Sequence, residues 1–216
     1  MAIRGKFITV EGTEGVGKTS NMTLIAKLLS DAGISHIVTR EPGGTPMAED
    51  IRGLLLTPRD ESVDPMTELL LIFAARAQHI ALSIEPALAA GQWVLCDRFT
   101  DATFAYQGGG RGLGDKPIAA LEALVQRELR PDLTLLLDAP VEVGMARAGK
   151  RGALDRFEQE KQRFFEDIRT CYLQRAAADS DRFMVIDASR SLDLVQSDIR
   201  KTVGAVISKH RVGDHV

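Results

Sequence analysis

The sequence is poor in cysteine and aromatic residues and carries little net charge. Only two of its 216 residues are cysteines, Cys96 and Cys171, which gives neither a disulfide framework nor the ligand spacing of a zinc site. The net charge is −3, so the chain has no general attraction to nucleic acid or to anionic membranes. Any anion that the protein binds must therefore be held by a local site.

Long apolar runs are also missing. The N-terminus has no extended apolar segment of the kind found in signal peptides, and no stretch approaches the length of a membrane span. We therefore expect a cytoplasmic protein without a membrane or nucleic-acid partner.

Short apolar runs alternate along the chain with longer segments of helical periodicity. Strands are expected at residues 6–10, 35–39, 93–97, 133–138 and 183–187. Helices are expected at residues 18–31, 49–56, 67–90, 117–129, 154–178 and 192–209. This pattern predicts one α/β domain over residues 1–216, in three layers, with a five-stranded parallel sheet and helices on both faces. The glycine-rich stretch 107–114 is expected to be a loop near a ligand, and the tail 211–216 to be loose.

The stretch VEGTEGVGKTS, residues 10–20, has the pattern G-x-x-x-x-G-K-[ST] between an expected strand and an expected helix. Such a loop turns backbone N–H groups toward phosphate oxygens, and the helix N-terminus adds its positive dipole end. Lys18 would reach the β- and γ-phosphates of ATP, and the Thr19 hydroxyl would ligate Mg²⁺. The alternative is a chance glycine turn that caps a helix. The expected ATP-binding residues are Gly12, Thr13, Glu14, Gly15, Val16, Gly17, Lys18 and Thr19.

This loop indicates a nucleoside triphosphate but not what is done with it. The guanine-reading motif N-K-x-D of switch GTPases is absent, because the single asparagine, Asn21, does not lie in such a motif. The signature of ATP-cassette proteins is absent as well.

Two further motifs follow expected strands and predict a second anion site. TREPGGT, residues 39–45, supplies Arg40 and a rigid Pro42, and DRF, residues 97–99, supplies Asp97 and Arg98. Ligands gather at the carboxyl ends of parallel strands, where an arginine suits phosphate and an acid can support Mg²⁺. The alternatives are a solvated arginine on a turn and a carboxylate that caps a turn. Two arginines facing the phosphate loop favour phosphoryl transfer between two nucleotides.

Together, EGTEGVGKT, TREPGGT, DRF and the arginine-rich stretch 146–157 resemble the thymidylate kinase family over nearly the whole chain. The resemblance implies the P-loop kinase fold and transfer of the γ-phosphate of ATP to dTMP with Mg²⁺ as cofactor. It also implies a homodimer that pairs through helices including residues 67–90.

The resemblance further implies residue roles on the acceptor side. Glu14, the acid inside the phosphate loop, would bond the 3′-hydroxyl of dTMP, and Glu11 is expected to be structural. Phe73 would stack on thymine, although core packing is the reading that the residues alone favour, and Arg76 would bond the edge of the base. The dTMP-binding residues are then Glu14, Arg40, Pro42, Phe73, Arg76, Arg98, Thr103, Tyr106 and Gln107, with Tyr106 near the sugar C2′ and Gln107 near the base.

The stretch ARAGKRGALDRF, residues 146–157, is expected to be a mobile basic lid, although a solvated charged loop is the usual reading of such a run. Family members without a basic residue in the variable part of the phosphate loop carry a catalytic arginine in this lid. We expect Arg151 in that role, then Arg147 and Arg156. The catalytic set is therefore Lys18, Asp97, Arg98 and Arg151.

Two other functions compete with this interpretation. A kinase for another nucleoside monophosphate or for a nucleoside would share the phosphate loop and the lid, but would not need the other motifs together. A nucleotide-dependent switch would need the phosphate loop alone.

Overall fold

The computed structural model describes residues 4–148, 156–157 and 160–213. Its five parallel strands form one sheet in the order β2-β3-β1-β4-β5, which confirms the predicted α/β architecture. The strands β3, β4 and β5 have the predicted bounds, and β1 and β2 lie one residue later than expected. The strands are β1 (Phe7–Glu11), β2 (His36–Arg40), β3 (Trp93–Asp97), β4 (Leu133–Asp138) and β5 (Phe183–Asp187).

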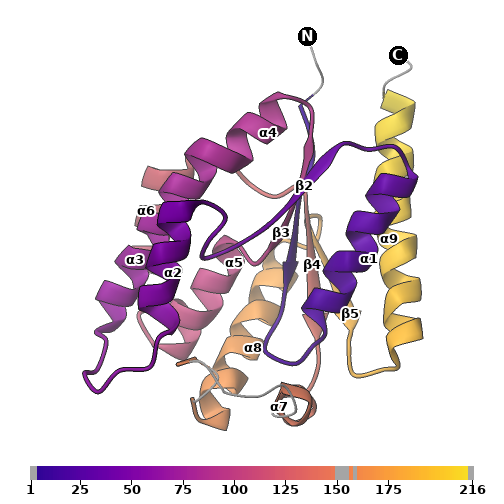
Figure 1. Cartoon of the computed structure of the whole chain (residues 1–216). Coiled ribbons are helices and arrows are strands. Elements are labelled where there is room, and N and C mark those ends of the chain that lie inside the picture. Colours follow the sequence, from indigo (N-terminus) through magenta and orange to yellow (C-terminus); the bar gives the residue numbers. More distant parts are fainter. Residues whose placement is uncertain (1–3, 149–155, 158–159, 214–216) are drawn as a thin grey trace.

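The register of the strands brings the functional motifs to one edge of the sheet. Asp97 at the end of β3 lies opposite Val10 of β1 and Arg40 of β2. The phosphate loop, the residues after β2 and the turn after β3 therefore leave the sheet side by side. Both termini lie toward the opposite edge (Figure 1).

Helices cover both faces of the sheet (Figure 1). One face carries α1 (Lys18–Asp31) and α9 (Leu192–Gly213), whose apolar side chains pack with those of the central strands in the largest core cluster. The helices on the other side are α2 (Pro46–Leu56), α3 (Pro65–His79), η1 (Ile80–Ile84), α4 (Glu85–Ala89), α5 (Thr100–Thr103), η2 (Phe104–Gly110), α6 (Asp115–Gln126) and α8 (Gln162–Ala178). A short helix, α7 (Val141–Ala148), follows β4.

The helices α3, η1 and α4 form one continuous stretch, Pro65–Ala89, that is long and apolar enough to cross a membrane by length and composition. The expectation that no stretch approaches a membrane span is therefore wrong on this criterion. The stretch supplies Leu69, Ile80, Ile84 and Leu88 to the buried core, which accounts for its apolar character.

Two further expectations fail for physical reasons. Residues 107–110 belong to the π-helical turn η2 and not to a loop. Its glycines serve close packing on α8, because a Cβ on Gly109 would lie 3.0 Å from the Cβ of Cys171 and one on Gly110 2.6 Å from the ring of Phe164. Residues 211–213 of the expected loose tail continue the helix α9, and residues 214–216 lie outside the described residues.

Candidate active site

The phosphate loop joins β1 to α1 in a backbone conformation that requires glycine. Gly12, Gly15 and Gly17 have φ values of 137°, 73° and 91°, in the region that side chains disfavour. Gly15 also lies against α7, where an added Cβ would be 1.9 Å from the carbonyl oxygen of Gly144. The loop is therefore a fixed shell of backbone N–H groups and not a flexible connection.

Lys18 closes this shell from inside. Its Nζ donates hydrogen bonds to the carbonyl oxygens of Gly12 at 3.1 Å and Thr13 at 2.9 Å, and lies 3.9 Å from Oε2 of Glu14. Burial, together with the nearby charge of Arg98, lowers the pKa of Lys18. The loop thus presents a desolvated ammonium group that an added phosphate would stabilise.

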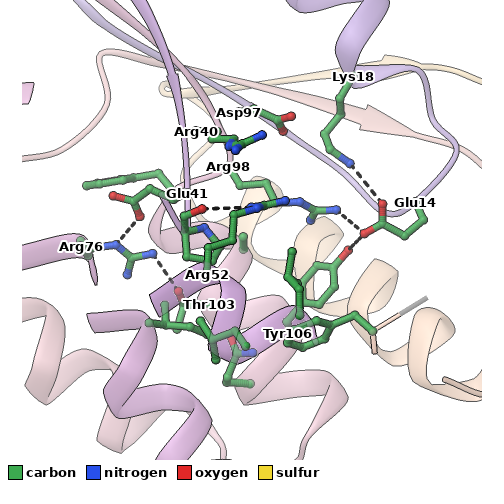
Figure 2. Close-up of a pocket in the computed structure, with 18 of the residues that line it drawn as sticks. Glu14, Lys18, Arg40, Glu41, Arg52, Arg76, Asp97, Arg98, Thr103 and Tyr106 are labelled. Atoms are coloured by element: carbon green, nitrogen blue, oxygen red, sulfur yellow. Dashed lines mark hydrogen bonds and ion pairs between the residues drawn. The ribbon is translucent and has the colours of Figure 1, made fainter. Parts of the chain in front are cut away.

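A cavity of about 330 Å³ lies in front of the loop (Figure 2). Its walls come from the phosphate loop, the ends of β2 and β3, and helices α2, α3, α5 and η2, together with Phe157. The sequence-predicted residues that line it are Glu14, Gly15, Gly17, Lys18, Thr19, Arg40, Pro42, Arg76, Asp97, Arg98, Thr103, Tyr106 and Gln107. Two residues of the loop itself, Thr13 and Val16, are buried, and Val16 belongs to the main core cluster.

Arg98 and Glu14 meet at one end of this cavity. Arg98 has a φ of 68°, unusual for a residue with a side chain, and its Nη2 donates to Oε1 of Glu14 at 2.5 Å. The same oxygen accepts from the hydroxyl of Tyr106 at 2.9 Å, and the Arg98 guanidinium lies 4.6 Å from the centre of the Tyr106 ring. The acid inside the phosphate loop is therefore compensated by an arginine from the next strand (Figure 2).

Glu11 supports this pair from behind. Its fully buried carboxyl accepts hydrogen bonds from the backbone N–H of Phe99 at 2.7 Å and the hydroxyl of Tyr172 at 2.8 Å. Burial raises the pKa of Glu11 to about 7, and the charge of Asp101 adds to the rise. The arrangement fixes the turn that holds Arg98, which agrees with the structural role expected for Glu11.

Arg76 forms a second polar centre at the other end of the cavity. Its Nε donates to Oε2 of Glu41 at 2.7 Å, and its Nη2 donates to the Thr103 hydroxyl at 3.0 Å. Glu41 is held in turn by Nδ1 of His79 at 2.9 Å. The remaining nitrogen, Nη1, is buried and has no hydrogen-bond partner among the described residues. A ligand with an acceptor atom would satisfy it.

Phe73 lies beneath Arg76 and does not line the cavity. Its ring is 2% exposed and packs with Leu69, Phe104 and Ile118. The Arg76 guanidinium lies 4.8 Å from the ring centre. In this structure Phe73 is therefore a core residue, as the residues alone suggested, and the surface of α3 that faces the cavity is made by Ile72 and Arg76.

Asp97 and Arg40 sit between the phosphate loop and the end of β2. The Oδ1 atom of Asp97 is buried and has no hydrogen-bond partner in the described part of the chain. Arg40 lines the cavity but is half exposed and forms a two-bond ion pair with Glu49 of α2, at 2.7 and 3.3 Å. The pair uses Nε and Nη2 of Arg40, so Nη1 can donate to a phosphate without breaking it.

The three arginines expected in the lid have different positions. Arg151 lies outside the described residues. Arg147 donates to the carbonyl oxygens of Ala188 at 2.8 Å and Ser189 at 3.2 Å. Arg156 donates to the carbonyl oxygen of Leu55 at 2.8 Å and pairs with the carboxylate of Glu68. Both described arginines are thus held by the protein.

Sequence reasoning missed several residues around the cavity. Arg52 and Phe157 line it, Glu41 orients Arg76, and Glu68 of α3 binds Gln107. The sequence contained one signal for Glu68, which is an acid at the start of a strongly apolar helical run. An acid that is buried with such a helix is rarely without a partner, so its position could have predicted a buried polar contact.

Comparisons with known proteins agree with this geometry. The family model described as thymidylate kinase matches residues 10–199. The chain belongs to the thymidylate kinase family. A thymidylate kinase of Pseudomonas putida is 58% identical over 207 residues, covering 96% of this chain and 99% of the relative. One from Alcanivorax borkumensis is 60% identical over 199 residues, covering 92% and 96% of the two chains.

A solved structure supports the thymidylate kinase fold independently. The crystal structure of thymidylate kinase from Ehrlichia chaffeensis matches with a TM-score of 0.77 at 31% identity, and the match covers 93% of this chain and 99% of that one. The predicted family and fold are therefore both confirmed.

Proposed function

We propose that this member of the thymidylate kinase family transfers the γ-phosphoryl group of ATP to dTMP at the described cavity, giving dTDP and ADP. The observation that carries the proposal is that Arg98 and Glu14, from the ends of neighbouring strands, meet at the mouth of a complete phosphate loop. A triphosphate site and a second anion site therefore open into one cavity. A binding switch would need only the first of the two.

On the donor side, the backbone of the loop and the N-terminus of α1 cradle the ATP phosphates. Lys18 exchanges its bonds to Gly12 and Thr13 for the β- and γ-phosphates, so that its charge is used where negative charge is transferred.

On the acceptor side, Arg98 and Arg40 hold the dTMP phosphate, and Glu14 accepts a hydrogen bond from the sugar hydroxyl. Arg76 presents its unpaired Nη1 to a carbonyl oxygen of thymine, and Gln107 and Thr103 complete the base site. Tyr106 packs near the sugar C2′ and disfavours ribose. The role left for Phe73 is to support Arg76 from below.

The residues present also fit Mg²⁺. Thr19 and Asp97 line the same cavity, and the buried Oδ1 of Asp97 has no other partner in the described chain. Among the described residues no three His, Cys, Asp or Glu side chains form a group that could hold a metal ion, so the other ligands of the ion would be phosphate oxygens and water. When bound, the ion neutralises charge on the β- and γ-phosphates.

The transfer itself needs positioning more than covalent chemistry. A dTMP phosphate oxygen attacks the γ-phosphorus in line, the bond to the β-phosphate oxygen breaks, and ADP leaves. The attacking oxygen is already anionic, so no strong general base is needed. Lys18, Arg98 and a lid arginine, with Arg151 as the first choice, stabilise the charge of the transition state.

We also infer a cytoplasmic homodimer. Leu70 of α3, Leu82 of η1 and Leu124 of α6 are 50%, 63% and 73% exposed, and α3 packs against α6. Exposed leucines on neighbouring helices favour a protein interface. Sedimentation of the unchanged protein and of Leu124→Glu would test both the dimer and this interface. A monomer mass for the unchanged protein would contradict the homodimer, and a dimer mass for Leu124→Glu would contradict this interface.

ADP release from ATP and Mg²⁺ with a panel of nucleoside monophosphates tests the function. We expect dTMP to be strongly preferred, dUMP to be weaker and UMP to be near background. If another monophosphate is preferred, the base site is wrong. If no monophosphate stimulates release, the chain is a nucleotide-binding switch instead.

A further inference from the structure

Glu68 is a fully buried carboxylate near the start of α3 that no step of the proposed transfer uses. Its Oε1 accepts from Nε2 of Gln107 at 2.8 Å and from Nε of Arg111 at 3.3 Å, and its Oε2 pairs with Nη2 of Arg156. Burying a carboxylate is costly unless its charge is compensated, and here two guanidinium groups compensate it. Two segments that are distant in the sequence from Glu68 and from each other, residues 107–111 and Arg156, therefore converge on this side chain.

Both arginines also lie over the ring of Phe157. The Arg156 guanidinium lies 4.6 Å from the ring centre and that of Arg111 lies 5.5 Å away. The ring packs edge-on against Tyr106, with 6.0 Å between centroids, and lines the cavity. Tyr106 in turn donates to Glu14. The position of this wall thus depends on where the two guanidinium groups are held.

The backbone around Arg156 is fixed in the same place. Its N–H donates to the carbonyl oxygen of Leu56 at 3.3 Å, and its Nε donates to that of Leu55 at 2.8 Å, both at the end of α2. These contacts set the position of the chain, while Glu68 sets the direction of the charged group.

The same carboxylate orients Gln107. A carboxylate only accepts hydrogen bonds, so it takes the amide N–H₂ of Gln107 and leaves the amide oxygen as the side-chain atom that can accept from a ligand. The base of dTMP has one ring N–H to offer.

We propose that Glu68 is a positioning residue for the acceptor nucleotide: it seats Phe157, through Arg111 and Arg156, as the wall of the nucleoside pocket and orients Gln107 toward the base. This proposal rests on the proposed function, since it assigns the pocket to dTMP.

The test compares steady-state kinetics of Glu68→Gln with those of the unchanged enzyme. We expect the KM for dTMP to rise about tenfold or more, because both elements that Glu68 positions face the acceptor, while the KM for ATP stays within about twofold. Glu61→Gln is the matched control, since it removes an acid that pairs with Arg59 on the surface. It should leave both KM values unchanged.

A double-mutant cycle separates positioning from general support of the fold. Phe157→Leu alone should raise the KM for dTMP about tenfold. Added to Glu68→Gln, it should raise the KM by less than about twofold relative to Glu68→Gln alone, because Phe157 is already displaced in that variant. Additive effects, or equal increases in both KM values, would overturn the proposal.

If Glu68→Gln does not fold, Arg156→Gln replaces it, because Arg111 and Gln107 still compensate the acid in that variant. It must raise the KM for dTMP selectively, and an unchanged value would overturn the proposal. If the unchanged enzyme does not phosphorylate dTMP, the proposed function fails instead, whatever the variants do.

Discussion

The carboxylate of Glu14 and the guanidinium of Arg98 lie 2.5 Å apart and join the phosphate loop to the turn after β3. The pair explains how an anion-binding loop can contain an acid. Arg98 cancels the local negative charge, while Glu14 keeps the arginine pointing into the cavity before a nucleotide arrives. Preorganised charge of this kind is effective because it need not be rearranged during the reaction.

Replacing Glu14 by glutamine should weaken the acceptor site. Loss of the charged partner of Arg98 and Tyr106 should lower kcat/KM for dTMP by about tenfold to a hundredfold. The KM for ATP should change by less than about threefold. Initial rates at varied dTMP and fixed ATP measure the effect, with the exposed Glu128→Gln as control. A change confined to ATP would contradict the assignment of Glu14.

Replacing Lys18 by methionine should remove the charge that follows the transferred phosphoryl group. We expect kcat to fall by about a hundredfold or more, with the fold retained. Lys27→Met, which breaks an exposed pair with Asp31, is the control. Single-turnover measurements give the rate of phosphoryl transfer in each variant. A change in KM for ATP without a change in kcat would contradict the proposed role of Lys18.

Chelation tests the metal site. Removal of Mg²⁺ with EDTA should abolish ADP release, and added Mg²⁺ should restore it. Thr19→Val should raise the Mg²⁺ concentration needed for half-maximal rate, because the hydroxyl that lines the cavity is lost. A titration with Mg²⁺ at constant ATP measures this, and an unchanged requirement would exclude Thr19 as a ligand.

Replacing Arg76 by lysine should affect both the base site and stability. Arg76 binds Glu41 and Thr103 through two different nitrogens of its planar guanidinium. The single ammonium nitrogen of lysine cannot reproduce this geometry. We expect kcat/KM for dTMP to fall about a hundredfold and the free energy of unfolding to fall by about 1–3 kcal/mol. Arg59→Lys on the surface is the control for a general arginine effect.

Glu11 should make stability depend on pH. Its pKa is raised from 4.5 to about 7, so the folded chain holds a proton that the unfolded chain has lost. The stability contributed by the neutral carboxyl is complete below pH 4.5 and is lost as the pH rises through 7.

Glu11→Gln keeps this group neutral at every pH. Its unfolding free energy relative to the unchanged protein should therefore increase between pH 4.5 and pH 8, by about 3 kcal/mol. Urea denaturation at several pH values measures the difference, and Glu128→Gln should show none. A difference that does not vary with pH would refute the raised pKa.

Much of the fold follows from local pattern. The strands β3, β4 and β5 and the helix α1 have the predicted bounds, because continuous apolar runs and the phosphate loop define them clearly. The helix α2 begins at Pro46, three residues before the expected start, because the Thr45 side chain caps it and Pro46 suits its first turn. The glycines of η2 resemble those of a loop in the sequence, but they permit close packing on α8, which depends on tertiary contact.

For the candidate site, too, local motifs predicted some residues, while others depend on tertiary contacts. The motifs located Lys18, Asp97 and Arg98, since each lies at a strand end or in a characteristic loop. Glu14 and Tyr106 were predicted from the family resemblance. Arg52, Glu68 and Phe157 contribute through helix packing and ion pairs between distant segments, and no local spacing encodes those. Core packing of Phe73 was likewise decided by its neighbours on α3, η2 and α6.

The contact between Gly15 and Gly144 has a consequence for how the enzyme senses its donor. Loop and helix meet backbone to backbone, with no side chain between them to absorb a displacement. A shift of the loop would therefore meet α7 (Val141–Ala148) directly. The last residues of α7 lie in the arginine-rich stretch 146–157, so a displacement of the helix would also move the start of that stretch. A spectroscopic label on Met145 would report that movement directly.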